Sequence, residues 1–268
     1  MGAAVVAFAA GGADALADQA TPTLPVSDYP RLWWDNTTST LTSPVRWDEQ
    51  DWFDFSAASL AVVGTAAFLD RPIRNWAQDH RGSSWENAAN KFEPLGSTAS
   101  FAVIGAFYLD GWIADNPQAE NTAVDAVSAS IVAGGIITPA LKELAGRSRP
   151  SAHKGRYHFR PFSNGASFPS GHATQAFAVA SVVAEHYNDN LLVQCIAYTA
   201  AGLVGVARID HNAHFASDVL AGALIGTTVG RASVRFGDDH RRKWAGKPVA
   251  LEPWFDGKSD GLRLSIDF

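Results

Sequence analysis

The sequence predicts an all-α protein: a compact bundle of about six core helices with an irregular N-terminal arm and a short C-terminal β-hairpin. Three observations favour this fold. Apolar residues make up 47% of the 268-residue chain, enough for a sizeable core. Apolar stretches of helical length recur along the chain, and period-two alternation appears at its end. The stretches lie at residues 55–69, 100–114, 126–141, 173–184, 191–207 and 219–234.

The start of the chain has features of an export signal. An apolar run up to Ala10 precedes an A-x-A sequence ending at Ala17, although the usual basic residues are missing. We interpret residues 1–17 as a signal-peptide remnant. Residues 18–50 are rich in Pro and Trp, so we expect an irregular arm that its tryptophans anchor to the bundle. These features place the protein in the cell envelope, periplasmic or exported.

The apolar stretches favour a water-soluble or peripheral bundle over membrane spans. Most are shorter than the ~20 apolar residues that cross a bilayer, and they are rich in Ala and Gly. Asp110 interrupts the second stretch, and the mean hydropathy of the chain is only -0.04. An integral membrane protein is the alternative, and association with a membrane surface fits either interpretation.

The last part of the chain, residues 241–268, differs from the rest. Residues 261–268 alternate apolar and polar side chains, which predicts a strand. Residues 249–255 are its expected partner across a turn that contains Asp256 and Gly257. We therefore expect a small hairpin packed on the bundle, after a helical domain at residues 51–240.

Charge indicates an anionic ligand of small size. The net charge of -6 argues against a nucleic-acid partner, which normally requires a basic face. Positive charge is instead concentrated in one segment, which Glu143 alone opposes. Its cations are Lys142, Arg147, Arg149, Lys154, Arg156 and Arg160.

A short motif, Pro169-Ser170-Gly171-His172, predicts the start of a helix. Ser170 is a typical N-cap, and the helix-forming residues after it leave free N–H groups at the helix start. Gly171 allows a ligand to approach the backbone, and His172 lies in the first turn beside it. An ordinary capped helix with an incidental histidine is the alternative.

A second motif combines Arg208 with His214 and Asp218. On a helix, His214 and Asp218 are four residues apart and face the same side, so the carboxylate can fix the imidazole tautomer. A histidine held in this way is a candidate nucleophile. The same region also allows a metal site, with His211, His214 and Asp218 as ligands and Asp210 nearby. The surrounding cations make that site less favourable for a divalent metal.

The third motif contains Lys142 at the end of an apolar stretch and Arg149 before Pro150. Pro150 excludes Arg149 from a helix, so both cations can point into one loop-lined pocket. The loop extends about 20 residues, to Ser170, and loops of that length are usually functional or disordered. Arg149 and Arg208 would bind phosphate oxygens as planar forks, and Lys142 as a point charge.

In this order, the three motifs resemble the signature of the phosphatidic acid phosphatase type 2 superfamily, which includes bacterial nonspecific acid phosphatases and vanadium haloperoxidases. The motifs cover residues 142–218, and the flanking helices extend the similarity from about residue 50 to 236. Many members have Ser before the arginine of the last motif, whereas this chain has Ala207. That difference removes a hydroxyl group but no phosphate ligand.

The resemblance implies a role for each matching residue. His214 would be the nucleophile that forms a phosphohistidine, Asp218 its orienting carboxylate, and His172 the general acid. The remaining matches would bind phosphate without a metal or other cofactor. They are Lys142, Arg149, Ser170, Gly171 and Arg208.

These observations predict a metal-independent phosphatase of the cell envelope that hydrolyses phosphate monoesters. The substrate would be a lipid phosphate such as phosphatidate, or a small organic phosphate; the oligomeric state stays open. Vanadate would act as an inhibitor. The alternatives are a vanadate-dependent haloperoxidase, which uses vanadate as a cofactor, a metallohydrolase built on the His/Asp cluster, and a non-catalytic relic.

Overall fold

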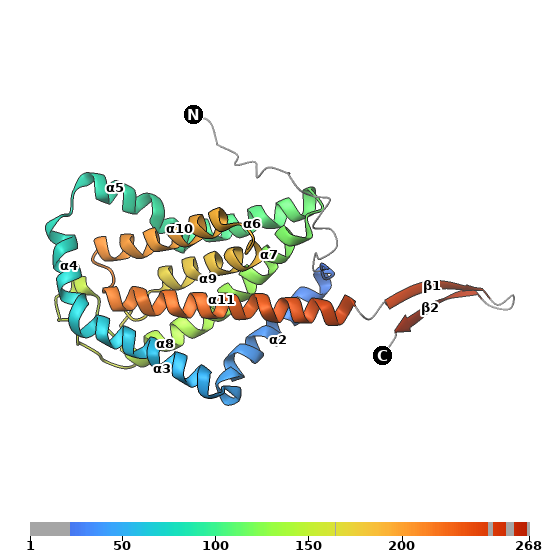
Figure 1. Cartoon of the computed structure of the whole chain (residues 1–268), viewed down its shortest axis with the longest axis horizontal. Helices are drawn as coiled ribbons and strands as arrows, with labels where there is room; N and C mark the ends of the chain where they lie inside the picture. The colour runs from blue at the N-terminus through green and yellow to red at the C-terminus, as the bar shows by residue number, and fades with distance from the viewer. Residues whose placement is uncertain (1–21, 164, 246–248, 256–259, 267–268) are drawn as a thin grey trace.

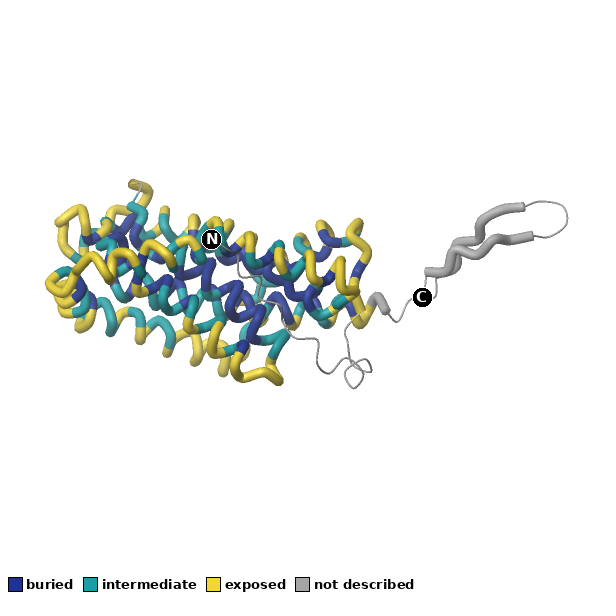
Figure 2. Tube along the Cα trace, turned by 90° about the horizontal axis from the view of Figure 1, so that it is seen from above, coloured by how far each residue is buried: buried dark blue, intermediate teal, exposed yellow. Residues whose placement is uncertain are grey.

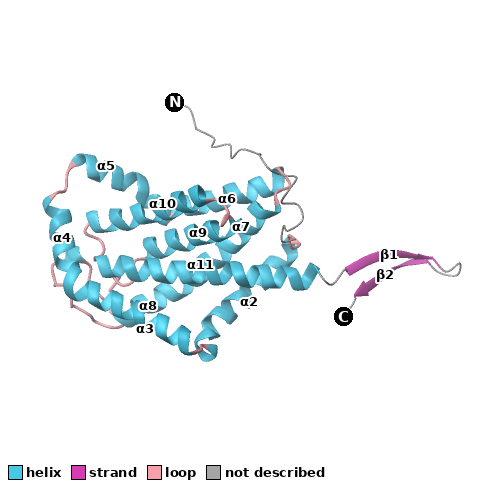
Figure 3. Ribbon diagram, viewed as in Figure 1, coloured by secondary structure: helices cyan, strands magenta, loops and turns pink. Residues whose placement is uncertain are grey.

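The structure, a computed structural model, describes residues 22–163, 165–245, 249–255 and 260–266. Within these residues the prediction of an all-α body is confirmed: long helices lie side by side (Figure 1). Loops connect them mainly at the ends of the bundle (Figure 3).

Each of the six predicted apolar stretches corresponds to helix. The first forms α3 (Glu49–Gly64) and η3 (Thr65–Leu69), and the second forms α6 (Thr98–Ile113). The third lies in a continuous helical segment made of α7 (Pro117–Ala129), η5 (Ser130–Ile137) and α8 (Thr138–Ala145). The last three form α9 (Gly171–His186), α10 (Leu191–Asp210) and α11 (Ala216–Ala245).

Local signals explain where several of these helices begin and end. Asn116 caps α7, with Pro117 in its first turn, and Asn190 caps α10. α8 ends at Gly146, whose φ is 57°. A Cβ at this position would lie 1.7 Å from the carbonyl oxygen of Arg160, so only glycine fits. The chain therefore turns sharply into the long loop that precedes α9.

α9 forms the centre of the bundle. It packs against α7, α10 and α11, and most of its side chains are buried. Figure 2 shows buried residues running through the middle of the bundle and exposed ones around the outside. The core cluster around α9 is rich in small aliphatic side chains, among them Val132, Val179, Val182, Val183 and Val229.

A stripe of glycines brings α11 close to α9. Gly222, Gly226 and Gly230 recur every four residues and therefore share one face of α11. A Cβ on Gly226 would lie 2.3 Å from the carbonyl oxygen of Thr174, and one on Gly222 would lie 2.6 Å from that of Ser170. The two backbones are thus in direct contact, as in small-residue packing between membrane helices. This contact places the start of α11 against the start of α9.

The prediction of an irregular N-terminal arm is wrong for residues 29–42, which form α2 (Tyr29–Thr42) after the short η1 (Val26–Asp28). Pro30 lies in the first helical turn, where proline is tolerated. Trp33 anchors the helix by donating a hydrogen bond of 3.2 Å to the carbonyl of Val124. Buried Asn36 adds hydrogen bonds to side chains of the bundle. After α2 the chain passes through η2 (Ser43–Arg46) into α3.

The polar segment between the first two apolar stretches is also helical. It forms α4 (Asp70–Asp79), α5 (Ser83–Phe92) and η4 (Glu93–Gly96). α5 and η4 pack against α10, and α4 contacts both α10 and α11. These short elements therefore cover the end of the bundle at which α10 ends and α11 begins (Figure 1).

The chain ends in two antiparallel strands, β1 (Val249–Phe255) and β2 (Asp260–Ile266), at the ranges where a hairpin was expected. Their register pairs Val249 with Ile266 and Phe255 with Asp260. Residues 246–248, which join α11 to β1, lie outside the described residues. The packing of this hairpin on the bundle therefore stays a prediction, as does the signal-peptide interpretation of residues 1–17, which are also outside.

The expectation of a periplasmic or exported, water-soluble bundle is wrong, and the protein is an integral membrane protein. Three helical segments are long and apolar enough to cross a bilayer: Glu49–Asp79, Pro117–Ala145 and Leu191–Asp210. In the first, none of the apolar window is buried inside the protein. Large apolar side chains on its surface therefore face lipid rather than a protein core. They include Phe53, Phe55, Leu60, Val63 and Phe68.

The error came from judging the apolar stretches separately. The first stretch ends at Leu69, but its helix continues through α4 to Asp79, which doubles its length. Asp70, the residue after this apolar stretch, is fully buried and paired inside the protein. The mean hydropathy is an average over apolar helices and polar segments, so its low value does not indicate the spans.

We predict that Gly226→Leu destabilises the bundle, because its side chain would force α9 and α11 apart. Overpacking of this kind costs about 1–3 kcal/mol, and the loss is measured by thermal unfolding of the purified protein in detergent micelles. Gly202→Leu in α10 is the matched control, since a Cβ at Gly202 has nothing within 4 Å. Equal stability of the two variants would contradict the close contact of α9 and α11.

Candidate active site

The three sequence motifs come together at one end of the bundle, where α8 and α10 end and α9 and α11 begin (Figure 1). Two hydrogen bonds join them. The backbone N–H of Ser170 donates to the carbonyl of Asp218 at 2.9 Å, and Lys142 Nζ donates to the carbonyl of Pro169 at 2.8 Å. Residues 76 positions apart in the sequence thus belong to one site.

His214 is buried in the turn between α10 and α11, with one ring nitrogen fixed. Its Nδ1 lies 2.7 Å from the carbonyl oxygen of Ser167 and 3.8 Å from Asp218 Oδ2. A carbonyl only accepts hydrogen bonds, so Nδ1 carries the proton and Nε2 keeps the free lone pair in neutral imidazole. The hydrogen bond that was expected from Asp218 is therefore made by the backbone of Ser167.

Asp218 positions His214 through neighbouring groups and through its charge. Its Oδ2 accepts hydrogen bonds from Ser167 Oγ at 2.6 Å and from the backbone N–H of Phe215 at 2.8 Å. The carboxylate thereby holds both the residue that binds Nδ1 and the backbone next to His214. It also places a negative charge near the ring, which would stabilise a cation formed there.

Burial lowers the pKa of His214 below its ordinary value, because the charged imidazolium loses its hydration. The nearby Asp218 carboxylate opposes this effect. The lowered pKa keeps the ring neutral near pH 7. A neutral ring with its lone pair on Nε2 is the form that a nucleophilic histidine requires.

Arg147 is the buried cation that holds Asp218. Its Nη1 donates to Asp218 Oδ1 at 2.5 Å, and its Nη2 donates to Asp70 Oδ2 at 2.7 Å. Ser217 bonds both residues: its hydroxyl accepts from Arg147 and donates to Asp70. All the charged members of this group are buried. The guanidinium also lies 4.3 Å from the ring centre of Phe215.

The sequence motifs predict Arg147 only as part of the basic segment, and they do not predict Asp70 or Ser167 as site residues. The spacing of Arg147 and Arg149 gave no indication that one is buried and the other exposed. Asp70 comes from α4, which lies about 150 residues before α11 in the sequence. Such partners become visible only when the helices are assembled.

The start of α9 is the helix N-terminus at which an anion site is predicted. Ser170 is fully buried and its hydroxyl accepts from the backbone N–H of Ala173, so it caps the helix as predicted. A Cβ on Gly171 would find only ordinary contacts, 3.6 Å from Thr138 and 3.9 Å from Lys142. The backbone N–H groups at a helix N-terminus suit an anion.

Arg208 contributes a buried guanidinium at the end of α10. Its Nη1 pairs with Glu93 of η4, and within the described part of the chain its buried Nε has no hydrogen-bond partner. Glu93 also lies 2.6 Å from Nδ1 of His211 and 3.8 Å from Nε2 of His172. Glu93 is not among the predicted site residues, because it lies 115 residues before Arg208 and outside the motifs. Its carboxylate neutralises part of the charge of this site.

His172 is half-buried in the first turn of α9. Burial, together with the charges of Arg149 and Lys142, lowers the pKa of His172 below its ordinary value. A bound phosphate dianion would oppose both cations and favour the protonated ring. His172 can therefore take up a proton when an anion enters the site.

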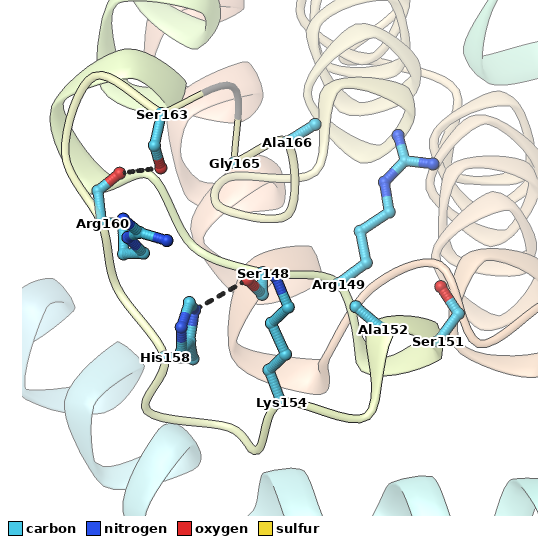
Figure 4. Close-up of a pocket in the computed structure, with 10 residues that line it drawn as sticks. All are labelled: Ser148, Arg149, Ser151, Ala152, Lys154, His158, Arg160, Ser163, Gly165 and Ala166. Carbon is cyan, nitrogen blue, oxygen red and sulfur yellow. Dashed lines mark hydrogen bonds between the residues drawn. The ribbon is translucent and has the colours of Figure 1, made fainter.

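Arg149 is exposed, unlike the other cations of the motif set. It lies on the rim of a cavity of about 410 Å³ that the loop between α8 and α9 forms. Figure 4 shows its guanidinium extending away from Lys154 and Arg160.

The alternative metal site is not assembled. His211 contacts Glu93, whereas His214 contacts Ser167, so the two histidines have different partners. Across the described ranges, no group of three or more His, Cys, Asp or Glu side chains is placed to hold a metal ion. The arrangement instead offers a nucleophilic nitrogen, a proton donor and cations around a helix start.

We predict that Arg147→Met lowers the stability of the protein by about 3–5 kcal/mol, because it leaves Asp70 and Asp218 buried without their cation. Unfolding in detergent with a chemical denaturant measures this loss. Arg149→Met, two residues away and exposed, should change the stability by less than about 0.5 kcal/mol. A similar effect of both substitutions would contradict the structural role of Arg147.

Comparison with known proteins gives the same family as the motifs. Residues 124–242 match the PAP2 superfamily. A lipid A 1-phosphatase from Porphyromonas gingivalis is 40% identical over 117 residues, which are 42% of this chain and 26% of that protein. Lipid phosphate phosphatase 2 from Arabidopsis thaliana is 28% identical over 165 residues, 48% of this chain and 54% of that protein. The chain thus spans between a quarter and about half of the length of these relatives.

The fold is also similar to a solved structure, that of a transmembrane PAP2 type phosphatidylglycerolphosphate phosphatase from Bacillus subtilis. The TM-score is 0.51 at 20% sequence identity, over 69% of this chain and 96% of the other. Residues 124–242, which match the PAP2 superfamily, contain α9, α10 and most of α11, and with them the candidate nucleophile and anion site. By its sequence match and its motifs, residues 124–242 of this chain form a region similar to the PAP2 superfamily.

Proposed function

We propose that this protein is a membrane-embedded lipid phosphate phosphatase that hydrolyses a phosphate monoester through a phosphohistidine on His214. One observation carries the proposal. His214 is buried with Nδ1 bound to the Ser167 carbonyl, so the neutral ring keeps a nucleophilic Nε2 beside the buried cations and the start of α9. We assign the catalytic unit to residues 51–240.

In the first step, Nε2 of His214 attacks phosphorus and forms a P–N bond, while the bond from phosphorus to the ester oxygen breaks. His172 gives its proton to the leaving oxygen, which departs as an alcohol. The positive charge on His214 is then stabilised by Asp218, whose own position depends on Arg147. In the second step, water attacks phosphorus, His172 takes up a proton, and the P–N bond breaks to release inorganic phosphate.

The phosphate oxygens would bind to the backbone N–H of Gly171 at the start of α9, to the hydroxyl of Ser170, and to the cations Lys142, Arg149 and Arg208. Lys142 is already oriented, because its Nζ donates to the carbonyls of Ala166 and Pro169. The unpartnered Nε of Arg208 offers a further donor for a phosphate oxygen. Charge that develops in the transition state would thus meet donors that need little reorganisation.

A lipid substrate is supported by two observations. The curated relatives are a lipid A 1-phosphatase and a lipid phosphate phosphatase. In addition, this chain has three helical segments able to span a bilayer, so its site is available to molecules anchored in the membrane. A lipid monophosphate such as phosphatidate, or the phosphate of a lipid A-type glycolipid, is the substrate class that fits both.

We predict that His214→Ala abolishes phosphate release, with a loss of at least about 10⁴-fold, because no other group can form the covalent intermediate. The assay measures inorganic phosphate released from phosphatidate in mixed detergent micelles. Orthovanadate should inhibit the wild-type protein, and EDTA should not. The matched control is His80→Ala, an exposed histidine at the C-cap of α4.

Retained turnover in folded His214→Ala would overturn the proposed nucleophile. Loss of wild-type activity in EDTA would instead favour a metal-dependent hydrolase. Equal losses in His214→Ala and His80→Ala would indicate a general effect on the protein rather than on the reaction.

A further inference from the structure

The cavity formed by the loop between α8 and α9 has features of a second anion site. It is lined by basic side chains and serine hydroxyls, and His214 is not among its lining residues. The proposed reaction requires none of Lys154, His158 and Arg160. The polar residues that line the cavity are Ser148, Arg149, Ser151, Lys154, His158, Arg160 and Ser163.

The cations of this cavity have no acidic partners. Among the described residues, neither Lys154 nor Arg160 forms an ion pair with a carboxylate, and the same holds for Arg149. Ordinary surface cations lie among acidic residues in a protein whose net charge is -6. Unpaired cations around one hollow therefore produce a local positive potential that attracts anions.

The loop is held in a defined shape. Ser148 donates from its backbone N–H to the carbonyl of His158 at 3.0 Å, and the hydroxyl of Ser148 lies 2.9 Å from Nδ1 of His158. The backbone N–H of Arg160 donates to the carbonyl of Gly146 at 3.0 Å. In Figure 4, Lys154 extends from the opposite side of the loop toward Ser148. A cavity fixed in this way loses little freedom when it binds a ligand.

The cavity adjoins the buried phosphate site through two residues. Arg149 belongs to its lining and also to the predicted phosphate-binding set. Ala166 lines the cavity as well, and its carbonyl accepts a hydrogen bond of 2.6 Å from Lys142 Nζ. A ligand with two separated phosphate groups could therefore contact both sites.

Exposed aromatic side chains of the same loop indicate its surroundings. Tyr157, Phe159 and Phe162 are all exposed, Phe162 to 76%. In membrane proteins, exposed aromatic residues next to cations are typical of the interface at which lipid headgroups lie. The cavity would then face the headgroup region of the membrane, which contains the lipid phosphate groups.

We propose that this cavity is a second phosphate-binding site, separate from the site of hydrolysis, and that Lys154 and Arg160 are its main ligands. The position of the first phosphate in this inference rests on the proposed function. The existence of the second site does not depend on it. Its ligand is a phosphate group, either a second one on the headgroup of the lipid substrate or free phosphate.

The test measures how many inorganic phosphate ions the full-length protein binds in detergent, by titration calorimetry. The wild-type protein should bind two per chain, and Lys154→Ala/Arg160→Ala should bind one. Each single substitution should weaken the second site by about tenfold, since a hydrogen bond to a charged group is lost. Lys91→Ala replaces an exposed cation of α5 and is the control, and this variant should still bind two phosphate ions per chain.

The same number of bound phosphates in the wild type and the double variant would overturn the proposal. The result separates this proposal from the proposed function. If the buried site does not bind phosphate, the wild type should bind one and the double variant none. The second site would then stand while the phosphatase assignment fails.

A kinetic arm distinguishes the two sources of phosphate. It compares a lipid monophosphate with a lipid that carries a second phosphate on the same headgroup. If the headgroup supplies the ligand, the double variant should raise the KM of the bisphosphorylated lipid about tenfold more than that of the monophosphate. Equal KM changes would assign the second site to free phosphate.

Discussion

The buried guanidinium of Arg147 between two carboxylates is the interaction on which the rest of the site depends. It joins Asp70 of α4, Asp218 of α11 and the loop after α8, three segments that are far apart in the sequence. Three charges in a low-dielectric interior are stable only when each one has its partners, so this group allows one arrangement of these segments. Asp218 in turn holds Ser167, and Ser167 fixes the tautomer of His214. The reactive nitrogen is thus selected by a chain of contacts that begins at Arg147.

The membrane setting gives this network a further consequence. The apolar window of the first spanning segment lies wholly outside the protein interior, and those of the other two are partly exposed, so polar groups must be satisfied inside the bundle. The glycine stripe of α11 brings its backbone against α9 and leaves the starts of both helices side by side. The helix start that is proposed to bind phosphate therefore lies against the turn that carries His214. The loop with its exposed aromatic residues extends from the same end, where a lipid headgroup would arrive.

Much of this could be predicted from the sequence, because short motifs and helical periodicity are local properties. The six apolar stretches predicted helices at the right places, and Ser170 predicted the start of α9. Properties set by distant contacts were missed. Asp70 follows an apolar stretch yet is a buried partner of Arg147, and Glu93 gives no signal for its pairing with Arg208. The Pro and Trp content predicted an irregular arm over α2, but Pro30 lies in the first helical turn, where proline is tolerated. The membrane spans were missed for a related reason, since a buried charge inside a helix lowers its hydropathy without shortening it.

The most direct test of the account is to trap the covalent intermediate. The protein is mixed with a lipid monophosphate labelled at phosphorus and quenched in alkali within one turnover, and the labelled peptide is identified by mass spectrometry. The account predicts a phosphoenzyme that is stable in alkali, labile in acid and located on His214. Its amount should be about one per active chain at the earliest times. Label on another residue, or product formation with no labelled protein at any time within the first turnover, would contradict it.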